Sequence, residues 1–192
     1  MTALLIRRRR PLGDPEARRF HDGTAGAGRI VQSLAEAGVV LDDARIRQLL
    51  LEPDALLTGL DPAASPESFE RVVLGSHLVN IPERDVRVDL LELARSLAAG
   101  DGAVFVEHHP IDWLETAAEV EATPGGSVGM TAVRVDPPFV SAVSVLDAGG
   151  RVVRQPFRAR VLTDAELDDA LAAARLRRVR RRGPTWIEAS PT

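Results

Sequence analysis

The chain has 192 residues, of which 45% are hydrophobic and 27% charged, and its formal net charge is −4. This length favours one domain with a well-buried core, and the small negative charge gives no general attraction to nucleic acid or to an anionic membrane. Cysteine is absent, which excludes disulfides, thiolate catalysis and cysteine-based zinc sites.

The first sixteen residues, 1–16, are expected to be a flexible leader. Four arginines at positions 7–10 precede a Pro- and Gly-rich stretch, a composition typical of loosely held chain. The apolar stretch comes before the basic run, which is the reverse of a secretory signal. No apolar run reaches the roughly 18–20 residues that span a bilayer. We therefore expect a cytoplasmic protein with no membrane partner, whose single domain occupies 17–192.

An acidic residue, a glycine-rich turn and an amphipathic helix follow one another early in this domain. Residues 17–22 are predicted to form a first strand that ends at Asp22. The turn from Thr24 to Gly28 then leads into a helix over 26–37, whose apolar residues recur at helical spacing. Glycine lets a ligand approach the backbone closely, and a helix N-terminus adds unpaired N–H groups. This order predicts a nucleotide-type site.

Two familiar phosphate-binding patterns fit this stretch poorly. A dinucleotide fingerprint that starts at Gly26 and Gly28 would place its third glycine at Val31. A phosphate loop would need Lys and a hydroxyl residue where the chain has Arg29 and Ile30, and the sequence contains no Lys. A nicotinamide oxidoreductase is accordingly disfavoured.

The next segments predict a parallel α/β unit. Short elements are expected first: a buried strand over 39–41, a helix over 44–51 and an extended piece at 53–55. A strand over 69–75, a helix over 83–99, a tight stop at 100–102 and an apolar strand over 103–106 follow. Strand, helix and strand with short joints predict a parallel, right-handed crossover.

Beyond residue 124 the apolar residues alternate with a period of two. Segments 128–136, 139–146 and 151–161 therefore predict an antiparallel meander. Thr163 and Glu166 have the spacing of a capping box before a helix over 165–174. Segments 176–181 and 185–189 predict a closing hairpin.

These motifs, in this order, resemble the class I S-adenosylmethionine-dependent methyltransferases of the small-molecule type. Residues 22–28 resemble the family's glycine motif, 69–74 its fourth strand and 97–106 the entry to its fifth strand. The resemblance extends over about 17–190. It implies an α/β fold with a Rossmann-like, mostly parallel sheet, helices on both faces, an antiparallel meander insertion at about 124–162 and a C-terminal β-hairpin.

The resemblance also implies S-adenosyl-L-methionine as the cofactor and assigns residues to it. The methionine portion and the ribose would lie against Asp22, Thr24, Gly26 and Gly28. The ribose hydroxyls would bind Asp42, with Asp43 as its rival, and the adenine edge would contact Asp54 and Ala55. The sulfonium would face Gly75, Ser76 and His77. Open α/β sheets bind ligands beyond the carboxyl ends of their strands, which agrees with these positions.

Methyl transfer needs alignment and, for some acceptors, a base. His77 and His109 are the candidates for the base or for orienting the substrate, and Asn80, His108 and Trp113 are candidates for binding the acceptor. Adjacent residues on a strand point to opposite faces, so the pair His108 and His109 predicts no metal site. The arginine-rich run 175–182 could contact RNA, but alternation on a hairpin also gives a solvated face, so nucleic acid is not expected.

The sequence therefore predicts methyl transfer from S-adenosylmethionine to an N or O nucleophile of a small molecule. A homodimer is compatible with the sequence. The alternative is a non-catalytic methyltransferase-fold module for binding or dimerisation, with a degenerate cofactor site. The polar first strand and the short second unit favour this alternative, whereas three histidines near the expected site favour the enzyme.

Overall fold

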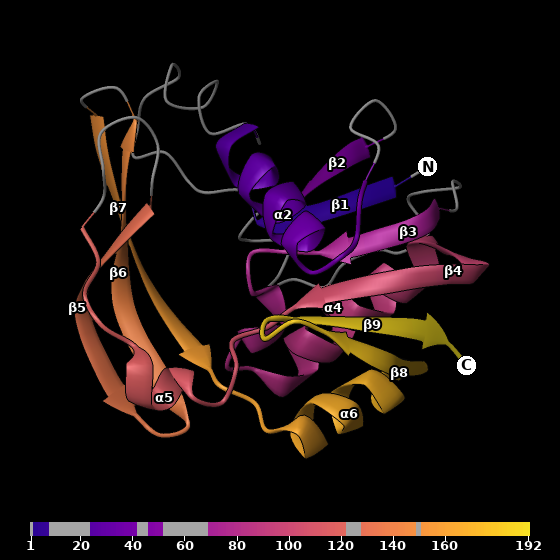
Figure 1. Cartoon of the computed structure of the whole chain (residues 1–192). Coiled ribbons are helices and arrows are strands. Elements are labelled where there is room, and N and C mark those ends of the chain that lie inside the picture. The colour runs from indigo at the N-terminus through magenta and orange to yellow at the C-terminus, as the bar shows by residue number, and fades with distance from the viewer. Residues whose placement is uncertain (1, 8–23, 42–45, 52–68, 122–127, 149–150) are drawn as a thin grey trace.

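The computed structural model of the chain describes residues 2–7, 24–41, 46–51, 69–121, 128–148 and 151–192, and the statements below concern these residues. A six-stranded sheet with helices on both faces lies beside a separate three-stranded sheet (Figure 1). The strands of the large sheet follow the order β2 (Ile46–Leu51), β1 (Thr2–Arg7), β3 (Phe69–Leu74), β4 (Ala98–Glu107), β9 (Trp186–Pro191) and β8 (Leu176–Arg182). Neighbours among the first four strands pair in parallel, and β9 pairs antiparallel with both β4 and β8. The predicted mostly parallel sheet is therefore confirmed.

Helices cover both faces of this sheet (Figure 1). α2 (Thr24–Glu36) lies on one face, and α4 (Arg84–Leu97) and α6 (Asp164–Ala173) lie on the other. The sheet residues alternate between the two cores: Val73, Phe105 and Trp186 pack with α2, whereas Val72, Leu74, Val104 and Val106 pack with α4 and α6. Because both faces are buried, β3 and β4 read as nearly continuous apolar runs in the sequence.

The second sheet is the predicted meander. It consists of β5 (Val128–Asp136), β6 (Phe139–Ala148) and β7 (Arg151–Arg160), paired antiparallel. The one-turn helix α5 (Trp113–Thr116) lies beside the lower end of this sheet in Figure 1. The chain then enters α6 through the predicted capping box, in which the Thr163 hydroxyl accepts from the Glu166 N–H and the Glu166 carboxylate accepts from the Thr163 N–H. The predicted closing hairpin is β8 and β9.

The prediction of a flexible leader is wrong for residues 2–7. These residues form β1, which lies between β2 and β3 in the large sheet. Their apolar run finds two strand partners far along the chain, and such pairing overrides the local composition. Residues 17–22, predicted as the first strand, lie outside the described residues.

Two predictions for the following unit are also wrong. Residues 39–41 form no strand: Val39 and Leu41 are buried against α2, but Val40 is 77% exposed. The predicted helix over 44–51 is instead strand β2 over its described part, because pairing with β1 fixes it. Short segments of this kind take the conformation that their tertiary partners impose.

The glycine-rich segments also differ from their predictions. The predicted helix over 26–37 is α2, but it begins two residues earlier, so that residues 24–28, also predicted as a turn, are helical. Glycine costs a helix about 0.5–1 kcal/mol per residue, whereas burying Ile30 and Leu34 completely contributes about 1.5–3 kcal/mol each. The predicted stop at 100–102 is part of β4, which begins directly after α4 and has a register irregularity there.

Gly75, the residue after β3, allows α2 to approach the sheet closely. A Cβ built on Gly75 would lie 2.5 Å from Cδ1 and 3.2 Å from Cγ1 of Ile30. Because Gly75 itself is buried, its missing side chain is what accommodates the helix.

We therefore expect Gly75→Ala to destabilise the fold by about 1–3 kcal/mol through overpacking. Ile30→Val removes the Cδ1 atom, so the double variant is expected to lose less free energy of unfolding than the sum of the two single losses. Urea unfolding of the four proteins measures this coupling, and strict additivity would contradict the close contact.

Candidate active site

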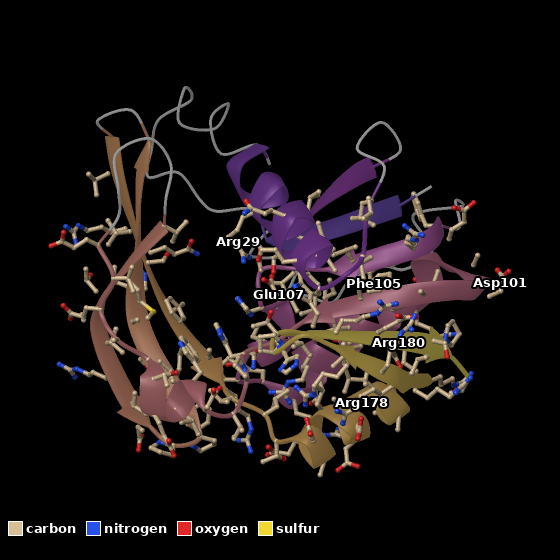
Figure 2. The ribbon with its side chains drawn as sticks, in the orientation of Figure 1. Arg29, Asp101, Phe105, Glu107, Arg178 and Arg180 are labelled. Carbon is tan, nitrogen blue, oxygen red and sulfur yellow. The ribbon has the colours of Figure 1, made fainter. Side chains whose placement is uncertain are left out.

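The carboxyl ends of β3 and β4 bring the candidate residues together. Because the two strands are parallel neighbours, the residues that follow them meet at one edge of the sheet, where open α/β folds bind ligands. His77 follows β3, and Glu107 is the last residue of β4. Arg29 reaches the same place from α2, as Figure 2 shows.

Arg29 and Glu107 form a two-pronged ion pair. The two terminal guanidinium nitrogens donate to the two carboxylate oxygens over 2.9 and 3.1 Å. The Glu107 side chain is 1% exposed, whereas that of Arg29 is 48% exposed. A buried carboxylate needs such a partner, since charge without compensation is costly away from water. The pair thus fastens α2 to the end of β4.

His77 lies next to this carboxylate in an uncommon backbone conformation. Both Ser76 and His77 have positive φ angles, 58° and 51°, a region that residues other than glycine adopt at a cost of about 1–3 kcal/mol and often at functional sites. Nε2 of His77 is 3.6 Å from Oε1 of Glu107, which is too long for a hydrogen bond. The Nδ1 atom is buried and has no hydrogen-bond partner among the described residues.

Burial, together with the positive charge of Arg29, lowers the pKa of His77 to about 3. The ring is therefore neutral at pH 7.

Three aromatic rings stack at this edge of the sheet. The His77 and His109 rings lie 3.8 Å apart at 14°, and the His109 and Trp113 rings lie 3.6 Å apart at 10°. Burial, followed by the charge of His77, lowers the pKa of His109 to about 2. The stack brings together three residues that the sequence assigned to the reaction or to the acceptor.

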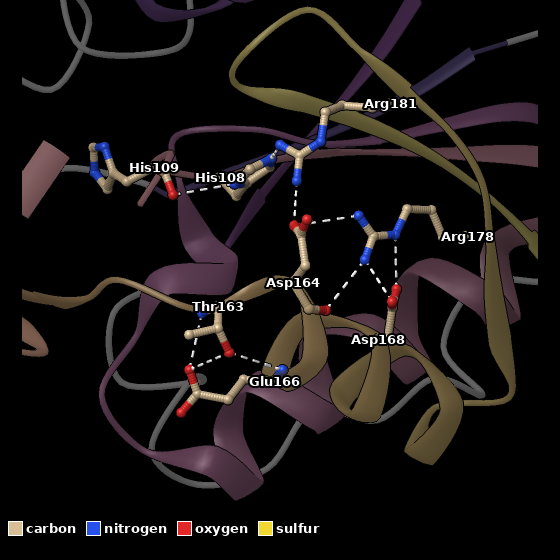
Figure 3. A network of polar contacts seen from close by, with 8 residues as sticks. All are labelled: His108, His109, Thr163, Asp164, Glu166, Asp168, Arg178 and Arg181. Atoms are coloured by element: carbon tan, nitrogen blue, oxygen red, sulfur yellow. Dashed lines mark hydrogen bonds and ion pairs between the residues drawn. The ribbon is translucent and has the colours of Figure 1, made fainter. Parts of the chain in front are cut away.

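Asn80 and His108 have other partners. Asn80 is 1% exposed, donates to the backbone oxygen of Arg160 and accepts from the N–H of His109. His108 is 3% exposed, and its ring lies between the His109 carbonyl and the Arg181 guanidinium (Figure 3). The acceptor contacts predicted for these two residues do not match this placement, because their polar groups face protein.

The arginine-rich run is largely neutralised by carboxylates. Arg178 and Arg181 pair with Asp164, and Arg178 also pairs with Asp168 (Figure 3). Arg180 and Arg182 both contact Glu188. These contacts agree with a solvated hairpin face.

Most residues predicted to bind the cofactor lie outside the described residues or in α2. Asp22, Asp42, Asp43, Asp54 and Ala55 belong to the first group, and Thr24, Gly26 and Gly28 belong to the second. Gly75 is in place at the end of β3, but its Cα faces Ile30, and Ser76 is exposed beside His77.

Sequence reasoning missed Arg29 and Glu107 as site residues. Glu107 had a usable signal, because it directly ends an apolar strand at the sheet edge where ligands bind. Arg29 had none, since it reads as an ordinary polar position of an amphipathic helix. Within the part of the chain that the structure describes, no three His, Asp or Glu side chains are grouped as metal ligands. In the same part, no helix is long and apolar enough to cross a membrane.

Removing the Arg29 side chain should leave Glu107 buried without its partner. We expect Arg29→Ala to lower the free energy of unfolding by about 1.5–3 kcal/mol, the range for hydrogen bonds to charged groups. The loss should not reach that of a fully buried pair, because half of the Arg29 side chain is exposed. Adding Glu107→Gln removes the buried charge and should recover part of the loss. Chemical denaturation of both variants checks this. An equal loss in the double variant would show that the buried charge is not the cause.

The neutral histidines make the fold sensitive to acid. In the unfolded chain these rings take up protons near their ordinary pKa of 6.5, whereas in the folded chain His77 and His109 do so only near 3 and 2. Between these values the unfolded state holds more protons, so stability is full above pH 6.5 and falls as the pH drops. Each ring contributes a slope of at most about 1.4 kcal/mol per pH unit. His109→Gln should therefore flatten the decline of unfolding free energy between pH 6.5 and 4.5, and an unchanged slope would contradict the burial of a neutral ring.

No protein-family model matches the sequence, and no curated protein matches it. Solved structures do resemble the fold. The CcbJ methyltransferase from Streptomyces caelestis superposes with a TM-score of 0.56 at 16% identity, covering 100% of this chain and 83% of the other. CalS10, an amino pentose methyltransferase from Micromonospora echinaspora solved with bound S-adenosylmethionine, gives 0.54 at 16% identity, covering 100% and 84%.

The sugar N-methyltransferase KedS8 from Streptoalloteichus gives a TM-score of 0.56 at 14% identity, covering 98% of this chain and 79% of the other. Each alignment covers the large sheet and the meander together. The chain therefore has the Rossmann-like α/β fold of the class I S-adenosylmethionine-dependent methyltransferases.

Proposed function

We propose that this protein transfers a methyl group from S-adenosylmethionine to an N or O nucleophile of a small molecule. The observation that carries the proposal is the meeting of a buried ion pair, a strained histidine and a ring stack at the carboxyl ends of β3 and β4. In a fold shared with methyltransferases, this edge is where ligand chemistry takes place. A cytoplasmic location and a homodimer remain expectations within this proposal.

The described residues leave no unpaired positive charge beside the stacked rings to oppose a cationic ligand group. When bound, the cofactor supplies a methyl group on a positively charged sulfur. Arg29 and Glu107 neutralise each other, and the rings of His77 and His109 are neutral and add no opposing charge. Aromatic faces attract cations as well. The residues proposed for the ribose and adenine are Asp42, Asp54 and Ala55, with Asp22 and the first turns of α2 at the methionine portion.

His77 is better suited to orienting the acceptor than to acting as a general base that takes a proton from it. A general base works best when its pKa is near the operating pH, whereas burial lowers the pKa of His77 to about 3. The His77 side chain is 24% exposed, so its ring can instead contact a nucleophile and align it. Correct alignment can account for about 7–11 kcal/mol of a barrier, so methyl transfer does not require a strong base here.

The substrate class rests on the comparisons and on this geometry together. CalS10 is an amino pentose methyltransferase and KedS8 a sugar N-methyltransferase. Both names describe methyltransferases that act on sugars, which are small polar molecules. We propose the same broad class for this protein, with the acceptor presented to His77 on the side where the meander sheet stands.

Thermal shifts with S-adenosylmethionine, S-adenosylhomocysteine and NADH test the cofactor directly. A ligand at 100 times its Kd stabilises the fold by about 2.7 kcal/mol, so both sulfur compounds should raise the melting temperature and NADH should not. A response to NADH alone would overturn the assignment. If neither sulfur compound raises the melting temperature, the result favours the non-catalytic module instead.

A variant at His77 tests its orienting role. His77→Asn keeps a polar group but removes the imidazole ring that aligns the acceptor, so we expect kcat to fall about ten- to a hundredfold, the equivalent of roughly 1.4–2.7 kcal/mol. The affinity for S-adenosylhomocysteine should change little. Methyl-transfer assays with small amines and alcohols, together with calorimetry, separate the two effects. Unchanged turnover in this variant would remove His77 from the site.

A further inference from the structure

Asn80 links three segments of the chain whose relative positions matter for the proposed reaction. It is in the short helix η3 (Leu78–Asn80), three residues after His77, and is 1% exposed. Its side-chain oxygen accepts from the N–H of His109 over 2.9 Å, and its nitrogen donates to the backbone oxygen of Arg160 over 2.8 Å. Arg160 is the last residue of β7. One amide thus links the end of β3, the peptide after β4 and the end of the meander sheet.

The chemistry of the two partners fixes which way the amide points. A backbone N–H can only donate and a backbone carbonyl can only accept, so the oxygen must face His109 and the nitrogen must face Arg160. Few other side chains present one donor and one acceptor at this length. The Asn80 side chain is buried and both bonds are partly buried, which makes the loss of either partner costly.

A second buried residue holds Asn80 in place. Arg87 of α4 is 4% exposed and donates to the backbone oxygens of Val79 and Ile81 over 2.8 and 2.6 Å. These two residues flank Asn80, so the backbone of η3 is fastened to α4 on both sides. Asn80 is therefore a rigid support for the residues it contacts.

We propose that Asn80 is a positioning residue, which fixes the peptide of His109 and joins the ring stack to the end of the meander sheet. It acts through His109 and touches no reacting atom itself. His109 lies between the rings of His77 and Trp113, so a shift of its backbone moves the middle ring of the stack. The catalytic part of this inference rests on the proposed methyl transfer, but the structural part does not.

The test uses the full chain and reads the stack directly. Ring protons of His109 between two parallel rings are expected to be shifted upfield in the NMR spectrum of the histidine-labelled protein. Asn80→Ala should remove at least half of this shift. Asn80→Asp keeps the acceptor for the His109 N–H and, while its buried carboxyl is protonated, a donor to Arg160, so it should retain most of the shift when the spectra are recorded at about pH 6 or below. If Asn80→Ala does not fold, Asn80→Ser, whose hydroxyl is too short to reach both partners, replaces it.

Leu97→Ala is the matched control. Leu97 is 2% exposed and ends α4 at the opposite end of the strands, so this variant loses core packing without touching Asn80. It should leave the His109 shift unchanged. An unchanged shift in Asn80→Ala, an equal collapse in Asn80→Ala and Asn80→Asp, or a similar collapse in Leu97→Ala would each overturn the proposal.

Kinetics then separate this inference from the proposed function. With an acceptor in hand, Asn80→Ala should lower kcat about ten- to a hundredfold through misplacement of the stack, while the affinity for S-adenosylhomocysteine stays within twofold. If the protein shows no methyl transfer at all, the NMR result still decides the positioning role. If transfer is intact in Asn80→Ala while the stack has moved, the stack is not part of the reaction and the catalytic inference fails.

Discussion

The site depends on one buried carboxylate. Glu107 ends β4 inside the protein, with 1% of its side chain exposed, and Arg29 crosses from α2 to neutralise it. The two residues are 78 positions apart in the chain, so the contact ties a helix to the sheet that it covers. Because an unpaired charge here would be costly, α2 cannot move away from the end of β4 without losing stability. Nε2 of His77 lies 3.6 Å from the same carboxylate, so the position of the Arg29–Glu107 pair determines which charged groups the His77 ring meets.

Polar contacts at the carboxyl ends of the strands complement an apolar sheet. The two hydrophobic cores hold the sheet between α2 on one face and α4 and α6 on the other. At the carboxyl ends of the strands the structure is held by polar groups instead. These are the amide of Asn80 and the guanidinium of Arg87, and they lie next to strained backbone at Ser76 and His77. Strain and buried polar groups of this kind are maintained by the packing around them. The geometry of the site thus depends on the whole sheet and not on the turn after β3 alone.

The sequence predicted the elements whose signals are local. The crossover from β3 through α4 to β4, the meander and the Thr163 capping box were all read correctly from periodicity and spacing. Residues 2–7 and 46–51 were not, because their strand character comes from pairing with each other and with β3, which leaves little local trace. The site followed the same rule. His77 and His109 were predicted to lie at adjacent strand ends, and their rings do meet there, whereas the Arg29–Glu107 pair joins distant positions that no local pattern connects.

A crystal structure of the protein with S-adenosylhomocysteine is the most direct test of the central claim. We expect the sulfur to lie beside His77, at the carboxyl ends of β3 and β4, with the Arg29–Glu107 pair intact and the ring stack adjoining the ligand. A ligand bound on another side of the sheet, or a complex in which the pair is broken to admit it, would contradict the account.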